Sequence, residues 1–220
     1  MQQNFEQARE NMVKSQISPN KVTGKALLAA LRRIPREKFL PESLKNRAYV
    51  DEDIHLDNGR YLPAPMFLAR LLQEADVQTT DAVLDVGCGT GYATALLGCC
   101  ARSVTGVEQD RRMAETGAAL LKSLGIGSAG IVQQSDLHQG YAPTAPYDVI
   151  LINGAVAEIP ARIKSQLAEG GRLVTVLSRH GHMGTAVLVT RRGEGFSTQI
   201  LFDAAMPFLA GFEEQKKFRF

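Results

Sequence analysis

Apolar residues occur along this chain in short runs that alternate with amphipathic segments, a pattern that predicts a mixed α/β protein. Two of the runs, 185–190 and 197–202, flank Gly193-Glu194-Gly195 and predict an antiparallel hairpin near the end of the chain. Five earlier runs are predicted strands, at 82–86, 103–107, 130–133, 148–152 and 172–177, and the run 148–152 is nearly continuously apolar, as a strand covered on both faces of a parallel sheet requires. The pattern therefore predicts a three-layer, doubly wound α/β fold with a mostly parallel, seven-stranded sheet.

Apolar residues at helical spacing predict helices before and between these strands. Pro65 and Pro160 are suited to the first turn of a helix, and Asp110 is suited to cap one. The helical segments are predicted at 22–34, 65–75, 110–125 and 160–170. Residues 36–61 show no strong period. We expect one domain, in which residues 1–78 form an N-terminal helical cap and residues 79–220 form the ligand-binding core.

Composition excludes several classes of protein. With 220 residues and 45% hydrophobic content, the chain can bury the core of one ordinary domain. The formal net charge of +2 demands no polyanionic partner, so no nucleic-acid partner is indicated. No apolar run approaches the roughly 18 residues of a membrane span, so we expect a cytoplasmic protein without a membrane partner. The sequence does not indicate the oligomeric state.

Cysteine and histidine residues are few and predict neither disulfides nor a metal site. The three cysteines, Cys88, Cys99 and Cys100, form no C-x-x-C motif and suit a reducing compartment. The pair His180 and His182 has no neighbouring cluster of cysteines or carboxylates that would complete a metal site.

A glycine-rich turn carries the main chemical signal. The run V-L-D-V-G-C-G-T-G-Y ends a predicted strand at Asp85 and continues through Gly87, Gly89 and Gly91 toward a helical segment. Glycine lets the backbone turn tightly and lets a ligand lie directly against it. Glu108 follows about 20 residues after the first glycine, at the end of the next strand, where a carboxylate accepts hydrogen bonds from ribose hydroxyls. This arrangement predicts a nucleoside-binding site.

The residues around the turn distinguish between nucleoside ligands. A dinucleotide such as NAD is the rival, but the G-x-G-x-x-G pattern calls for a small residue where Tyr92 stands. Asp85 would repel a pyrophosphate, whereas it can receive the ammonium of a methionine moiety. The charge therefore favours S-adenosylmethionine and methyl transfer. A purely structural loop between strand and helix is the alternative.

Two later strand ends complete the predicted cofactor site, because ligands of open α/β sheets bind at the carboxyl ends of the strands. Asp136 is placed to accept a hydrogen bond from an adenine amino group, with a turn or helix cap as the alternative role. Asn153 is placed where methyl donor and acceptor meet, with a purely structural role as the alternative. The predicted cofactor-binding residues are Asp85, Gly87, Cys88, Gly89, Gly91, Tyr92, Glu108, Gln109, Asp136, Leu137 and Asn153.

Motifs along nearly the whole chain resemble the protein-L-isoaspartate O-methyltransferase family, whose fold is a Rossmann-like methyltransferase. Residues 9–17, R-E-x-M-V-x-x-Q-I, are similar to the N-terminal helix of that family. Residues 34–41, I-P-R-E-x-F-x-P, are similar to its V-P-R-x-x-F-V-P segment, and A-Y-x-D follows at 48–51. A-P-Y-D at 145–148 and L-x-x-G-G-R-L-V at 167–174 resemble its later motifs.

The resemblance implies repair chemistry, in which the free α-carboxylate of an L-isoaspartyl residue in a damaged protein is methylated and then closes to a succinimide. The cofactor would be S-adenosylmethionine, with S-adenosylhomocysteine as product, and the partner an isoaspartyl peptide or protein. Because a carboxylate is already ionised at neutral pH, no general base is needed. Catalysis would come from alignment and exclusion of water, without a nucleophilic serine or cysteine.

The loop over the expected substrate differs from the family pattern. Where the family has G-Q-T-I-S-x-P, this chain has G-R-Y-L-P-A-P at 59–65, so no catalytic residue is assigned beyond the candidates Arg60, Tyr61, Pro63 and Asn153. Arg60 either clamps a substrate carboxylate or lies on the surface beside a proline-stiffened loop. Tyr61 either stacks on the substrate or packs under the loop. A methyltransferase with another acceptor, or a donor-binding protein without turnover, are the alternative functions.

Overall fold

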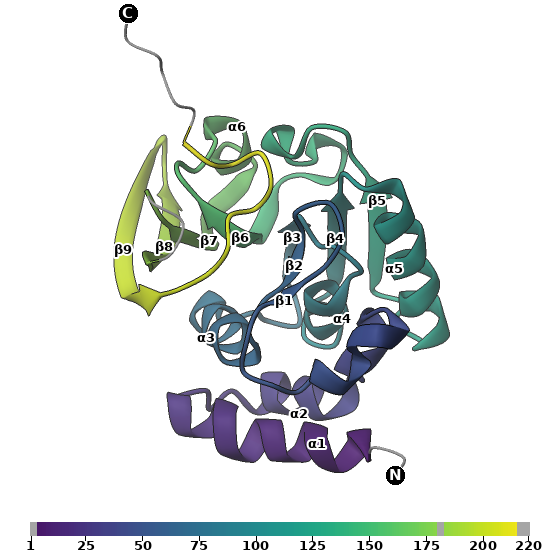
Figure 1. The fold of residues 1–220 in the computed structure, drawn as a ribbon. Coiled ribbons are helices and arrows are strands. Elements are labelled where there is room, and N and C mark those ends of the chain that lie inside the picture. Colours follow the sequence, from purple (N-terminus) through teal and green to yellow (C-terminus); the bar gives the residue numbers. More distant parts are fainter. Residues whose placement is uncertain (1–3, 180–182, 215–220) are drawn as a thin grey trace, which may run out of the picture.

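Seven strands form one sheet in the computed structural model, which describes residues 4–179 and 183–214. The strands lie in the order β5-β4-β3-β6-β7-β8-β9 (Figure 1). The pairs among β5, β4, β3, β6 and β7 are parallel, whereas β8 is antiparallel to both β7 and β9. The strand bounds are β3 Ala82–Val86, β4 Ser103–Glu108, β5 Ala129–Gln133, β6 Tyr147–Val156, β7 Leu167–Leu177, β8 Gly184–Arg192 and β9 Gly195–Ala204. The predicted mostly parallel, seven-stranded α/β fold is confirmed.

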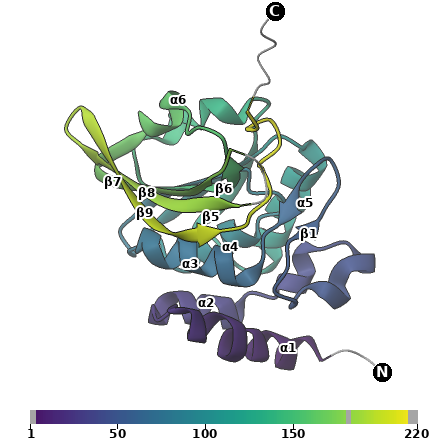
Figure 2. The ribbon, with the colours of Figure 1, turned by 60° about the vertical axis from the view of Figure 1, so that its left-hand side comes forward.

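Helices and short turns cover both faces of this sheet, because alternate residues of its buried strands face opposite sides. Val149 and Leu151 of β6 belong to the core under α3, α4 and α5, whereas Ile150 and Ile152 belong to the core under α6. Figure 2 shows α3 and α4 on one side of the sheet, α6 on the other, and α2 and α1 as a further layer. The helix bounds are α1 Phe5–Asn11, α2 Lys25–Arg33, α3 Pro65–Ala75, α4 Tyr92–Gly98, α5 Arg111–Ser123 and α6 Ala161–Lys164.

Short helical segments complete the connections. A π-helix, Met12–Ile17, continues directly from α1. The 3₁₀ segments are Ser18–Asn20, Arg36–Phe39, Glu42–Arg47, Leu137–Gln139 and Ala142–Thr144. No helix among residues 4–179 and 183–214 is long and apolar enough to cross a membrane.

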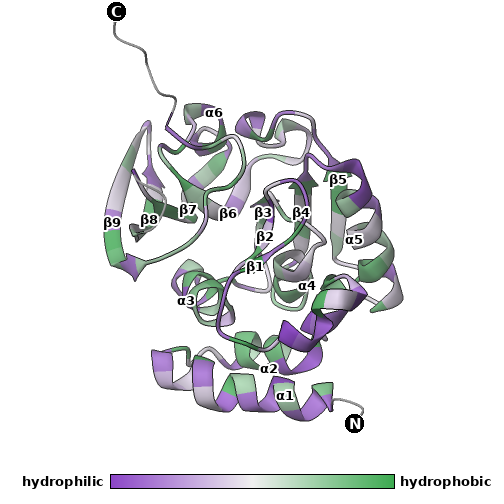
Figure 3. Cartoon of the chain, viewed as in Figure 1, coloured by the Kyte–Doolittle hydropathy of each residue, from purple (hydrophilic) through white to green (hydrophobic). Residues whose placement is uncertain are grey.

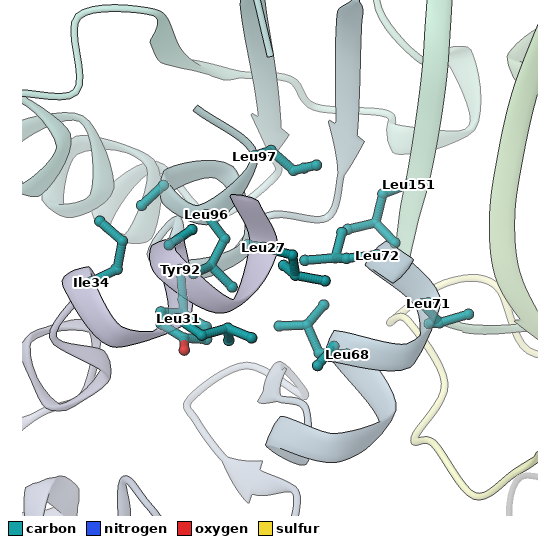
Figure 4. Close-up of a cluster of buried hydrophobic side chains, with 14 of the residues drawn as sticks. Leu27, Leu31, Ile34, Leu68, Leu71, Leu72, Tyr92, Leu96, Leu97 and Leu151 are labelled. Carbon is teal, nitrogen blue, oxygen red and sulfur yellow. The ribbon is translucent and has the colours of Figure 1, made fainter. Parts of the chain in front are cut away.

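The core between the outer helices and the sheet is built from leucine side chains of three helices. Leu31 of α2, Leu68 of α3 and Leu96 of α4 meet there and are each no more than 1% exposed (Figure 4). Figure 3 shows that α1, α3 and α5 carry hydrophobic and hydrophilic residues side by side, as expected of helices that bury one face. This packing holds α4, and with it the turn that precedes α4, against β3 and β4.

Two details of the sequence prediction are wrong. The helix expected over 160–170 is only the four-residue α6, because Leu167 already pairs with Tyr147 as the start of β7. The strand expected at 148–152 is longer and extends to Val156, with a register shift against β7 between Leu151 and Ala155. Tertiary pairing overrides the local helical pattern in the first case.

A two-stranded hairpin, β1 Ile54–His55 and β2 Tyr61–Leu62, lies where no period was found. Its turn contains Asn58 and Gly59, both at positive φ (56° and 69°). This is the backbone region that Asn and Gly tolerate best. The hairpin carries Arg60 and Tyr61, and in Figure 1 it lies in front of β3 and β4.

Arg36, within the segment that resembles the family motif, anchors this hairpin. Its side chain is fully buried, its Nε donates to the Ala48 carbonyl and its Nη2 to the Pro63 carbonyl, both at 2.7 Å. The guanidinium also lies 4.9 Å from the centre of the Tyr92 ring. The motif residue therefore ties both ends of the hairpin segment to the first turn of α4.

Arg36→Lys is expected to lower the free energy of unfolding by about 2–4 kcal/mol, because an ammonium lacks the planar fork that serves both carbonyls. Urea denaturation measures the loss. Arg47→Lys is the control, since the Arg47 side chain is 52% exposed and its replacement is expected to change stability by less than about 0.5 kcal/mol. Equal stabilities of the two variants would contradict the anchoring role.

Candidate active site

The glycine turn joins β3 to α4 at the carboxyl end of the sheet. Gly87 and Gly89 have φ of 77° and 57°, a backbone conformation that residues with a Cβ rarely adopt. The amides of Gly87 and Cys88 both donate to the Val107 carbonyl of β4, at 2.9 and 3.1 Å. The turn is therefore fixed against the neighbouring strand, and the predicted glycine positions are those that need glycine.

Glu108, at the end of β4, is fully buried and organises the turn. Its Oε2 accepts from the Gly89 amide at 2.7 Å, and its Oε1 accepts from the amides of Gln109 and Asp110 at 2.8 and 3.0 Å. The guanidinium of Arg60 donates to the same Oε2 and forms a buried ion pair. The carboxylate thus lies where a ribose would be expected, and its hydrogen-bonding capacity is already in use.

Asp85, at the end of β3, is the second buried carboxyl group of the site. Its Oδ2 accepts from the Thr94 hydroxyl at 2.7 Å, while its buried Oδ1 has no hydrogen-bond partner. Burial raises the pKa of Asp85 to about 7; the negative charge of Glu108 adds to the rise, and Thr94 and Asn153 oppose it. A cation placed beside Oδ1 would restore the ionised form.

Asn153 lies within β6, at its register shift, and not just beyond the strand as the sequence suggested. Its Oδ1 is buried and has no hydrogen-bond partner. Asn153 lies close enough to Asp85 to influence the pKa of that carboxyl group. The Asp85 carboxyl group at the end of β3 and the Asn153 amide within β6 therefore each keep one buried oxygen without a hydrogen-bond donor.

The remaining predicted cofactor residues lie around this centre in different roles. Cys88 is buried in the turn, and burial raises the pKa of its thiol. The Tyr92 ring is part of the helical core (Figure 4), and the Phe39 ring lies edge-on to it with ring centroids 5.5 Å apart. Gln109 is exposed beside Glu108, and Leu137 is buried beyond β5.

Asp136 lies at the exposed edge of the site and caps a short turn. Its carboxylate accepts from the His138 amide at 3.0 Å and from the Gln139 side chain at 2.8 Å, contacts that lower its pKa. This is the capping role that was the alternative to adenine recognition. The His138 ring stacks on Phe212, with ring centroids 4.0 Å apart.

The three candidate residues of the altered loop, Arg60, Tyr61 and Pro63, lie in different surroundings. Of the two roles left open for Arg60, the place on the surface is wrong, because its side chain is 6% exposed and is paired with Glu108. Tyr61 is 38% exposed, and its ring meets His55 edge-on at 4.9 Å instead of packing under the loop. The Pro63 carbonyl accepts from Arg36. Of the three, Arg60 alone contacts a carboxylate at a strand end, that of Glu108.

Sequence reasoning missed two contributors to the site. Thr94, in the first turn of α4, donates its hydroxyl to Asp85, and its position nine residues after the acid was a signal available in the sequence. Leu209 has no such signal. It lies on a segment that follows β9 and runs beside the end of β6, where the Leu209 amide donates to the Ala155 carbonyl at 2.8 Å. Its side chain fills the space beside Gly87 that a Cβ would occupy.

The cysteines and histidines were the other candidates for chemistry in the sequence. Cys88, Cys99 and Cys100 are free thiols. Within the described ranges, no group of three or more His, Cys, Asp or Glu side chains is placed to hold a metal ion. His180 and His182 lie outside the described residues.

These groups fit S-adenosylmethionine in their chemistry. The unpartnered oxygens of Asp85 and Asn153 can accept from an ammonium group, and Glu108 offers a carboxylate for ribose hydroxyls. The space itself is filled by Arg60 and Leu209. The cavity between the hairpin, the glycine turn and the segment after β9 holds about 10 Å³, too little for more than a single water.

The parallel sheet, the glycine turn and the paired acids at adjacent strand ends define the core of a Rossmann-like methyltransferase. A family model described as protein-L-isoaspartate(D-aspartate) O-methyltransferase matches residues 7–205. The chain belongs to this family.

Relatives and solved structures agree with this assignment. A protein-L-isoaspartate O-methyltransferase of Rhodopseudomonas palustris is 36% identical over 203 residues, which cover 92% of this chain and 93% of the relative. One from Methanoculleus marisnigri is 35% identical over 185 residues and covers 84% of each chain. A solved structure named protein-L-isoaspartate O-methyltransferase superposes with a TM-score of 0.80 at 25% identity, covering 92% of this chain and 66% of its own. A structure from Plasmodium falciparum, in complex with S-adenosyl-L-homocysteine, shares the fold with a TM-score of 0.76 at 19% identity, covering 94% of this chain and 98% of its own.

Proposed function

We propose that this protein is an S-adenosylmethionine-dependent methyltransferase that methylates the free α-carboxylate of L-isoaspartyl residues in damaged peptides and proteins. The observation that carries the proposal is the pair of buried acids, Asp85 and Glu108, at adjacent strand ends beside the glycine turn of a chain in this family. The free thiols of the chain suit the reducing conditions of the cytoplasm, where we expect the protein to act.

The residues that would hold the cofactor are those with unused or exchangeable hydrogen-bonding capacity. Glu108 would accept from the ribose hydroxyls, and Asp85 with Asn153 would accept from the amino group of the methionine part. The open side of the Gly89 turn, where a Cβ would meet no atom within 4 Å, leaves the backbone accessible to a nucleoside. Asp136 and Leu137, beyond β5, are the candidates for the adenine end.

Catalysis in this proposal depends on binding and not on a protein base. When bound, S-adenosylmethionine supplies a sulfonium methyl group, which a carboxylate oxygen accepts as the electron pair of the C–S bond goes to sulfur. Asp85 and Glu108 hold their partners in a buried, water-poor site, where alignment of the reacting groups lowers the barrier most effectively. Arg60 supplies a positive charge beside Glu108 and can bind a carboxylate through two N–H groups.

The test compares two peptides that differ only in the linkage of one residue. We expect base-labile methyl esters to form on the L-isoaspartyl peptide at a rate at least about 100-fold above that on the normal aspartyl peptide, a difference of about 3 kcal/mol in transition-state binding. Mass spectrometry and labelled S-adenosylmethionine measure the esters. Equal labelling of both peptides, or labelling of neither by a protein that binds the cofactor, would contradict isoaspartyl specificity.

A further inference from the structure

The proposed cofactor site is closed by side chains of this chain, and the closure has a specific chemistry. Glu108 uses both carboxylate oxygens, and Arg60 shares Oε2 with the Gly89 amide. The amides of Gly89, Gln109 and Asp110 belong to the turn itself, whereas Arg60 comes from the hairpin 48 residues away in sequence. Of the four donors, Arg60 is the one that a ribose can replace without unfolding the turn.

The Arg60 guanidinium pairs with Glu108 through Nη2 but does not use all of its hydrogen-bond donors. Its Nε is buried without a hydrogen-bond partner, so part of its capacity to donate is unused. Its backbone is well fixed, because the Arg60 carbonyl accepts from the Leu56 amide at 2.7 Å and its amide donates to Asp57 at 3.1 Å. Leaving Glu108 therefore requires rotation of the side chain and no rearrangement of the hairpin.

Leu209 closes the neighbouring part of the site. The ends of its side chain lie against Gly87, where a close approach of ligand to backbone was expected. The Ala155 amide donates to the Pro207 carbonyl and the Ala157 amide to the Phe212 carbonyl, at 2.8 and 2.9 Å. These bonds fix the backbone of the segment, so opening here is also a side-chain movement.

The surroundings provide a place for the released guanidinium. Arg60 lines the small cavity together with Tyr61, Pro63, Asn153 and Gly154, on the side of the hairpin where the methyl acceptor is expected. No carboxylate other than Glu108 makes an ion pair with Arg60 within the part of the chain that the structure describes. An incoming carboxylate is the partner that would satisfy the guanidinium after its release.

We propose that Arg60 and Leu209 close the cofactor site of the free enzyme, and that cofactor binding at Glu108 releases the Arg60 guanidinium to bind the carboxylate of the methyl acceptor. This inference rests on the proposed function. It makes Arg60 the residue that couples the two binding events. Coupling between two sites is reciprocal, so the acceptor must favour cofactor binding by the same factor as the cofactor favours acceptor binding.

The experiment is calorimetric titration of S-adenosylhomocysteine into the wild-type protein and into Arg60→Ala and Leu209→Ala. Removing a competing group raises the fraction of binding-competent protein, so we expect both variants to bind S-adenosylhomocysteine about tenfold more tightly. Arg47→Ala, which removes an exposed arginine paired with Glu52, is the matched control and is expected to bind like the wild type. Unchanged or weaker binding by Arg60→Ala would overturn the closure.

A second titration tests the coupling without any methyl transfer. Saturating L-isoaspartyl peptide is expected to tighten S-adenosylhomocysteine binding to the wild type about tenfold, and to have no effect on binding to Arg60→Ala. The aspartyl peptide is the control. Absence of coupling in a wild-type protein that methylates the isoaspartyl peptide would overturn this inference alone. Absence of coupling together with absence of methylation would overturn the proposed function as well.

Discussion

Asp85→Asn is expected to stabilise the free protein at pH 8 and to weaken its binding of S-adenosylhomocysteine by about 100-fold or more. The variant keeps the shape of the side chain and its bond to Thr94 but removes a buried negative charge. Loss of a charge that pairs with a buried ammonium costs about 3 kcal/mol or more in affinity. Calorimetry measures the affinity, and urea denaturation measures the stability.

The pH dependence of this effect has a definite sign. The folded-state pKa of Asp85 is about 7 against 3.8 in its unperturbed state. Folding therefore favours the protonated form, and the wild type loses stability as the pH rises from about 4 to 7, by at most about 4 kcal/mol. Asp85→Asn should lack this loss, so its advantage over the wild type is greatest above pH 7 and disappears below pH 4.

A matched control separates burial from charge. Asp203→Asn replaces an exposed aspartate of β9 and is expected to change neither the pH dependence nor the affinity. If Asp85→Asn is less stable than the wild type at pH 8, the ionised Asp85 carboxylate is stabilised in the folded protein and is not a source of instability. If it binds S-adenosylhomocysteine as tightly as the wild type, Asp85 does not hold the amino group.

Glu108→Gln is expected to lower the free energy of unfolding by about 3–5 kcal/mol and to abolish measurable cofactor binding. The change leaves the buried Arg60 guanidinium without a charge partner, which is costly in a dry site. It also removes one of the two acceptor oxygens, because an amide group has only one. Either the amides of Gln109 and Asp110 or the amide of Gly89 then lose their acceptor. Urea denaturation and calorimetry measure the two losses.

The double variant Glu108→Gln/Arg60→Met distinguishes these causes. Removing the stranded cation should restore about half or more of the lost stability, while cofactor binding stays absent because the ribose acceptor is still missing. Recovery of cofactor binding in the double variant would show that Glu108 acts only as the partner of Arg60 and not as a ligand for the cofactor.

The parts of the fold that sequence reasoning predicted are those governed by local pattern. β3, β4 and the glycine turn could be predicted because both strands are short runs that contain two valines and the turn needs residues without a Cβ. Asp110 caps α5 as expected, accepting from the Met113 amide. The hairpin was missed because strands of two residues carry no period, although Asn58-Gly59 was a readable turn signal.

The parts that could not be predicted depend on contacts between distant segments. Nothing in the sequence around Arg60 indicates that its guanidinium pairs with Glu108, and the interpretation of Arg60 as a surface residue failed for that reason. The place of Leu209 against Gly87 likewise depends on the path of the segment after β9. The helix expected over 160–170 failed because strand pairing of Leu167 with Tyr147 outweighs local propensity.

The most direct test of the account is a crystal structure of the wild-type protein with S-adenosylhomocysteine. We expect the ribose hydroxyls on Glu108 in place of the Arg60 guanidinium, the amino group beside Asp85 and Asn153, and the Leu209 side chain turned away from Gly87. A complex in which Arg60 still pairs with Glu108 and the ligand lies elsewhere would contradict it, and so would the absence of bound ligand at millimolar concentration.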